Sequence, residues 1–76
     1  MPTVLRAGGF AFHIYPDDHE PAHVHAYNGD GWCKVEIATD VVIKVVGMKT
    51  PDAKEASRIV KAHRALLTRK WEQIHG

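Results

Sequence analysis

Residues 22–38, AHVHAYNGDGWCKVEIA, alternate polar and apolar side chains on both sides of an Asn-Gly pair. Successive side chains of a strand point to opposite faces, so this alternation predicts two strands that each bury one face. The pair Asn28-Gly29 favours a two-residue type I′ turn between strands at residues 22–27 and 32–38. The predicted register has these cross-strand pairs: Tyr27 with Asp30, His25 with Trp32, Val24 with Cys33, His23 with Lys34 and Ala22 with Val35. Because the apolar positions oppose one another, we expect this hairpin to lie at the centre of an antiparallel sheet.

Three further runs have the residue types of strands. We expect strands at residues 3–6, 10–15 and 41–46, and the sequence does not determine the register of the last one. Two prolines bound residues 16–21, which therefore predict a loop rather than a helix or a strand.

The C-terminal third has the pattern of a helix. Thr50 is suited to the N-cap, Pro51 to the first helical position, and apolar residues then recur with helical spacing to about residue 74. The predicted fold class is α+β: an antiparallel meander of four or five strands, at about residues 3–46, packed against one long C-terminal helix, at about residues 51–74. The helix should cross the sheet face that carries Phe10, Phe12, Val24 and Val35.

The composition is typical of a small folded domain, here residues 1–76. The chain is 45% hydrophobic and 25% charged, and so short a chain buries little core alone, which favours a homodimer as one arrangement. The single cysteine, Cys33, falls on the predicted buried face, and the sequence has neither a leader-like segment nor an apolar run long enough for a membrane span. We therefore expect a cytoplasmic protein that does not bind a membrane.

Ten residues, 16–25, concentrate the side chains that could carry chemistry. They hold three of the six histidines together with Asp17, Asp18 and Glu20. The letters HEPAH, residues 19–23, match the H-E-x-x-H pattern of zinc proteases, but Pro21 opposes the helix which that pattern needs. We therefore reject the protease interpretation.

Because side chains alternate between the two faces of a strand, the sequence predicts that one face of the sheet carries several histidines, here called the histidine face. His23 and His25 point to the same side, and pairing with the preceding strand adds His13 and Tyr15 to it. Two histidines on one strand can reach a single ion of zinc or another divalent metal, which needs three or four ligands. The metal-ligand candidates are His13, Asp18, His19, His23 and His25. In the simpler alternative, the histidines only pack against Tyr15 and Trp32.

Two other kinds of site fit the same residues. His23 and His25, with Lys34 and Glu36 as cross-strand neighbours, could act as acid and base on a phosphodiester. Alternatively, Tyr15 and Trp32 could stack on nucleic-acid bases or grip a protein, with phosphates held by basic residues on the solvent side of the helix. These basic candidates are Lys54, Arg58, Lys61 and Arg64, for which an ordinary solvated helix face is the simpler interpretation.

The N-terminal half resembles a known family. In order and spacing, MPTVLR at residues 1–6, GGF at 8–10, DHEP at 18–21 and HVH at 23–25 resemble the small prokaryotic domain-of-unknown-function family 4160, whose signature is D-H-E-P-P-H-V-H. Ala22 stands where the family usually has a second proline. The resemblance implies one component of a toxin-antitoxin-like two-protein pair, with a small cognate protein as partner and nucleic acid as a further candidate. The alternative function is a nuclease or other hydrolase, metal-assisted or histidine-based, that uses the same site.

Overall fold

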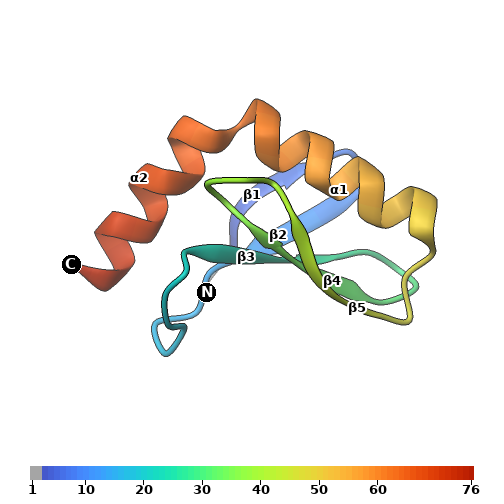
Figure 1. The fold of residues 1–76 in the computed structure, drawn as a ribbon, viewed down its shortest axis with the longest axis horizontal. Helices are drawn as coiled ribbons and strands as arrows, with labels where there is room; N and C mark the ends of the chain where they lie inside the picture. Colours follow the sequence, from blue (N-terminus) through green and yellow to red (C-terminus); the bar gives the residue numbers. More distant parts are fainter. Residues whose placement is uncertain (1–2) are drawn as a thin grey trace.

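The structure, a computed structural model, describes residues 3–76 and shows an antiparallel sheet with two helices along one side (Figure 1). The predicted limits of the domain include Met1 and Pro2, which lie outside the described residues. In chain order the elements are β1 Thr3–Ala7, β2 Phe10–His13, β3 His23–Tyr27, β4 Trp32–Glu36, β5 Val42–Val46, α1 Thr50–Ala62 and α2 Arg64–His75. The strands are hydrogen-bonded in the order β1-β2-β3-β4-β5, so the predicted α+β meander is confirmed.

The predicted register of the central hairpin is wrong by two residues. Tyr27 opposes Trp32, and His25 opposes Lys34. The loop has four residues rather than two because Asn28 organises it: its side-chain oxygen accepts hydrogen bonds from the backbone of Asp30 at 2.9 Å and of Gly31 at 3.1 Å. A shift of two residues keeps every side chain on its predicted face.

The fifth strand pairs with β4 through an irregular register. Trp32 opposes Val46 and Lys34 opposes Lys44, after which a bulge inserts Ile43 before Val42 opposes Val35. At the hairpin end the two strands approach closely, because a Cβ on Gly31 would lie 2.1 Å from the carbonyl oxygen of Val46. Glycine at position 31 therefore allows the end of β5 to approach the loop between β3 and β4.

The core lies between the sheet and the helices. The predicted core residues Phe10, Phe12, Val24 and Val35 are all buried, and the helices bury Ala56, Ile59, Val60, Leu67 and Trp71 against the same cluster. Neither described helix is long and apolar enough to cross a membrane.

The prediction of one long helix is wrong, because the chain breaks at His63. The backbone N–H of His63 is shared between the carbonyls of Ile59 and Val60, and its ring Nδ1 lies 3.0 Å from the Ile59 oxygen. Immediately after the break, Arg64 donates from Nε to the carbonyl of Ile37 at 2.8 Å and pairs with the Asp40 carboxylate. These contacts start a second helix, which runs past the sheet toward the connection between β2 and β3 (Figure 1).

The predicted start of the helix also differs by one residue. Lys49 is the N-cap of α1, and Thr50 is already helical. No side chain of the described residues caps this end, so Thr50 does not have the capping role predicted for it.

Candidate functional site

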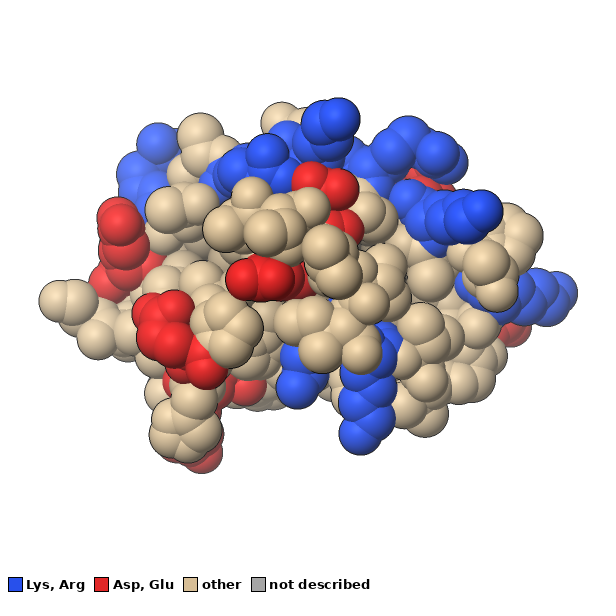
Figure 2. All heavy atoms as spheres, viewed as in Figure 1, with Lys and Arg blue, Asp and Glu red and all other residues tan. Residues whose placement is uncertain are grey.

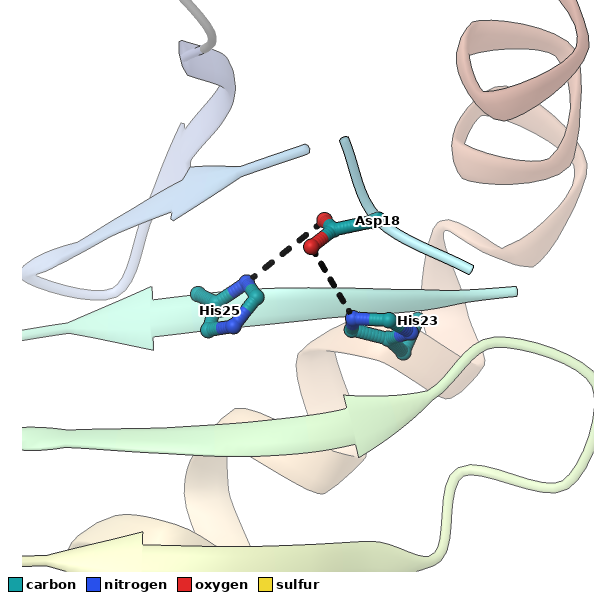
Figure 3. A group of neighbouring side chains, drawn as sticks. All are labelled: Asp18, His23 and His25. Carbon is teal, nitrogen blue, oxygen red and sulfur yellow. Dashed lines mark ion pairs between the residues drawn. The ribbon is translucent and has the colours of Figure 1, made fainter. Parts of the chain in front are cut away.

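Strand β3 and the loop before it bring together Asp18, His23 and His25 (Figure 3). The two histidines are two residues apart on β3 and therefore face the same side of the sheet. Asp18 reaches them because two hydrogen bonds to Tyr15 hold the turn in which it lies. The backbone N–H of Asp18 donates to the Tyr15 carbonyl, and its carboxylate accepts from the Tyr15 N–H, each at 3.0 Å. His23 Nε2 lies 3.5 Å from Asp18 Oδ1, and His25 Nδ1 lies 3.8 Å from Asp18 Oδ2.

The hydrogen bonds of His23 define which ring nitrogen carries the proton in the neutral side chain. Its Nδ1 lies 2.8 Å from the carbonyl oxygen of Pro21, which can only accept, so Nδ1 must donate. In the neutral ring, Nε2 then presents a lone pair toward the Asp18 carboxylate. Metal-binding histidines have this arrangement, in which a backbone carbonyl fixes one nitrogen and the other is free for the ion.

His25 presents a second unused nitrogen to the same point. Its Nδ1 is buried and has no hydrogen-bond partner among the described residues. Burial lowers the pKa of His25 below its usual value of 6.5; Asp18 opposes this effect, whereas His23, Lys34 and His13 reinforce it. The lowered pKa keeps the ring neutral near pH 7, which is the form that binds metal.

The spacing of the three side chains suits one ion. Ligand atoms about 2 Å from a tetrahedral metal stand about 3.4 Å apart, and each histidine nitrogen lies near this distance from a different oxygen of Asp18, at 3.5 Å for His23 and 3.8 Å for His25. All three ligand atoms lie within 4.8 Å of one another. A set of two histidines and one carboxylate is typical of zinc and of other first-row transition metals.

The other two predicted metal ligands lie outside this group. His13 is opposite His25 across β2 and β3, but its ring packs against Tyr15 and Tyr27, with centroid distances of 5.9 and 4.9 Å. Burial, followed by the charge of Arg6, lowers the pKa of His13. His19 is exposed in the loop. The structure therefore brings together three of the five candidates.

A pocket of about 340 Å³ opens beside two of the three side chains, Asp18 and His23. Asp18, His23, Lys34 and Ile43 are among the residues that line it. Lys34 opposes His25 and Glu36 opposes His23, so both predicted catalytic neighbours occupy the histidine face, although in a different register from the one predicted. A larger hollow of about 660 Å³ lies between the β1–β2 and β3–β4 turns and includes none of the three side chains. We place the site at the smaller pocket, because the ligand geometry is there.

Helix α2 contributes residues that the sequence did not point to. The ring of Trp71 packs 5.5 Å from that of His23, and its Nε1 donates to the Glu20 carboxylate at 3.3 Å. His75 Nε2 lies 3.2 Å from the carbonyl oxygen of Tyr15. These contacts cover the loop that carries Asp18. They depend on the break at His63, for which the apolar periodicity of the helix gives no signal.

The predicted aromatic and basic binding residues are separated in the structure. Trp32 packs beside His25 at 5.4 Å between ring centroids, and the hydroxyl of Tyr15 lies 2.9 Å from that of Tyr27. The basic candidates lie on the helices, away from these aromatic rings. Lys54 and Lys61 are exposed, whereas Arg58 pairs with Glu55.

The sequence predicted Arg64 on the solvent side of the helix, and this prediction is wrong. It is partly buried, donates a hydrogen bond to the carbonyl of Ile37 and forms an ion pair with Asp40, so its side chain stabilises the fold.

Comparison with protein-family models assigns the chain to a family. The chain belongs to the family described as "Domain of unknown function (DUF4160)", whose model matches residues 9–72. This match confirms the resemblance seen in the sequence. No curated protein and no solved structure shows a significant match to the chain.

Proposed function

We propose that this chain binds one divalent transition metal ion, with zinc as the first candidate, through Asp18, His23 and His25, and that the site hydrolyses a phosphodiester. The observation that carries the proposal is the convergence of two imidazole nitrogens on one carboxylate, of which His23 Nε2 carries no proton when its ring is neutral. In the neutral ring, the lone pair of His23 Nε2 faces a carboxylate oxygen at 3.5 Å, an unfavourable contact that a cation between the two atoms would relieve. A metal ion at this point satisfies all three groups.

The remaining residues of the pocket support hydrolysis. A zinc ion with three protein ligands keeps a further position for water, and it lowers the pKa of that water to about 7. Lys34 lines the pocket beside His23 and can hold a phosphate oxygen of the substrate. The single cysteine, Cys33, is fully buried, and burial raises its thiol pKa to about 11. We therefore assign it no part in the reaction.

Metal analysis of untagged protein, followed by zinc titration, tests the proposal. We expect one zinc per chain, and we expect Asp18→Asn, His23→Ala and His25→Ala each to abolish stoichiometric binding. His19→Ala is the matched control, because this exposed histidine lies in the same loop and should leave binding unchanged. Zinc at 100 times its dissociation constant should also stabilise the fold by about 2.7 kcal/mol.

Hydrolysis is measured separately with bis(p-nitrophenyl) phosphate. Activity should disappear after chelation and return with zinc, and Lys34→Ala should raise KM more than it lowers kcat. Activity that survives chelation but is lost in His23→Ala would refute the metal requirement and support acid-base chemistry by the same histidines. Absence of both zinc binding and a thermal shift would refute the proposal.

The outer edge of the sheet favours a second role, as one component of a two-protein regulatory pair of the toxin-antitoxin type. Strand β5 exposes Ile43, Val45 and Val46, and the preceding Val41 is exposed as well. Exposed apolar groups on an edge strand mark a surface for another chain. We propose a prokaryotic, cytoplasmic setting for both roles, which suits a chain with one buried cysteine. His23→Ala should abolish hydrolysis and leave a complex with the cognate protein intact.

A further inference from the structure

Strand β5 ends the sheet with an edge that pairs with no further strand of the described residues. In the strand order it pairs with β4 alone, so its outer backbone N–H and C=O groups face away from the sheet. Native edges of this kind are usually shortened, charged or covered, because they can pair with a strand from another chain. Here most of the exposed side chains are apolar: Val41, just before the strand, is 54% exposed, Ile43 47%, Val45 45% and Val46 41%. Lys44 is exposed as well.

The apolar groups occur on both faces of β5. Val45 opposes the buried Cys33 and so lies on the face that α1 covers, whereas Val46 opposes Trp32 on the histidine face. The bulge between Val42 and Lys44 turns Ile43 toward the pocket that Lys34 lines. A flat partner that touched one face would leave half of these groups in water. An added strand would contact both sets, because its own side chains alternate between the two faces.

Unpaired lysines surround this edge. Lys44 lies on the histidine face, with its Nζ 5.8 Å from the centre of the Trp32 ring, and Lys49 follows the strand. On the other face, Ser57 donates to the carbonyl of Asp40 in the turn before β5, so that side of α1 faces β5. Lys54 and Lys61 are one turn from Ser57 on this side of the helix. None of these four lysines forms an ion pair within residues 3–76.

The surface view agrees with this distribution. Figure 2 shows basic side chains along the top, at the right and at the lower centre of the molecule, whereas acidic side chains lie at the left and in the centre. Two acidic groups lie beside the start of the strand: Asp40 pairs with Arg64, and Glu36 accepts a hydrogen bond from the Thr39 hydroxyl, so neither forms an ion pair with these lysines. The lysines around β5 are therefore available to an incoming chain.

We propose that β5 is the docking site for an acidic, apolar strand of a partner protein, which extends the sheet beyond β5. This inference rests on the two-protein role proposed above and names the chemistry of the partner's segment. A second copy of this chain fits poorly, because two copies of β5 would bring the same lysines together. Carboxylates between apolar residues would instead meet Lys44 on one face and Lys54 and Lys61 on the other.

The test uses two capped peptides, one that alternates glutamate with valine and one that alternates lysine with valine. We expect the acidic peptide to shift the backbone amide signals of β5 in the isotope-labelled chain, and we expect salt to weaken this effect. The lysine peptide should cause no shifts. Reversing two charges, with Lys44→Glu and Lys54→Glu, should weaken binding of the acidic peptide about tenfold, if each lost pair contributes as an exposed ion pair does.

The control is Arg6→Glu with Arg69→Glu, which changes the net charge equally at exposed positions outside β4, β5 and α1. It should bind the acidic peptide like the unmodified chain. Equal binding of both peptides, or binding of neither, overturns the inference. Dimerisation with shifts in β5 in the absence of peptide also overturns it, because the occupant would then be a second copy. If a cognate protein binds and its complex is unaffected by the charge reversal, the two-protein role stands and only the assignment to β5 fails.

Discussion

At the scale of single residues, the site depends on how one imidazole ring and one carboxylate are oriented. The Pro21 carbonyl fixes the ring of His23, and the carboxylate of Asp18 is fixed by the Tyr15 backbone. Both groups are therefore held in place by backbone atoms rather than by mobile side chains. Such preorganisation lowers the entropy that binding of an ion would cost.

The same residues predict how stability depends on pH. Because the pKa of His25 is lowered from 6.5, chiefly by burial, the unfolded chain binds more protons than the folded chain between that lowered pKa and 6.5. The free energy of unfolding of the metal-free protein should therefore fall as the pH drops below 6.5, and this contribution should level off below the lowered pKa. Denaturation by urea between pH 7.5 and 5 measures it.

Replacing the titrating ring should reduce this slope. His25→Gln keeps a polar side chain without the proton equilibrium, so its stability should fall less over the same pH range. His13, whose pKa is also lowered, should account for part of the slope that remains. The exposed His19→Gln is the control and should behave like the unmodified chain. An unchanged slope in His25→Gln would show that this ring is not the group responsible.

At the scale of the elements, the pairing of β4 with β5 depends on a close backbone contact. Gly31→Ala should destabilise the fold by about 2 to 3 kcal/mol, because its new methyl group would lie 2.1 Å from the Val46 carbonyl oxygen and force the strands apart. Gly29→Ala, in the same loop, has no atom within 4 Å of the added carbon among the described residues and should change stability by less than about 0.5 kcal/mol. Equal effects in urea denaturation would mean that β5 does not approach Gly31 as described.

Strand parity explains why the histidine face could be predicted. The sequence placed Tyr15, His23, His25 and Trp32 on one face, and an error of two residues in register did not move any of them to the other. The loop length was mispredicted because Asn28 was taken as part of a two-residue turn, whereas its side chain closes a longer loop.

The position of Asp18 and the break in the helix could not be predicted in the same way. Loop residues have no periodicity, so the sequence could not distinguish Asp18 from the candidate His19. The break at His63 depends on the contacts of Arg64 with Ile37 and Asp40, which are 27 and 24 residues away. Only the assembled fold brings these groups together.

At the scale of the whole molecule, the two proposed roles occupy separate places. The proposed metal ligands lie on β3 and on the loop before it (Figure 3), with Trp71 of α2 beside His23, whereas the lysine-flanked edge lies along β5, at the end of the strand order. Ile43 connects them, because it belongs to β5 and also lines the pocket beside His23. A strand added at β5 would therefore border the opening of that pocket. This arrangement allows a partner to control access to the site without contact with the metal ligands.

The bend between the helices should couple the fold to the metal site. Arg64→Ala removes the contacts that direct α2, and with it Trp71, toward His23, so we expect a loss of about 1 to 2 kcal/mol in stability, a value that allows for the partial exposure of the pair. Zinc affinity should also fall several-fold, because α2 would no longer hold the loop of Asp18. Arg58→Ala breaks only the exposed pair with Glu55 and should cost less than about 0.5 kcal/mol, with zinc binding unchanged. Urea denaturation and zinc titration of both variants measure this, and a destabilised Arg64→Ala with full zinc affinity would show that the bend supports the core but not the site.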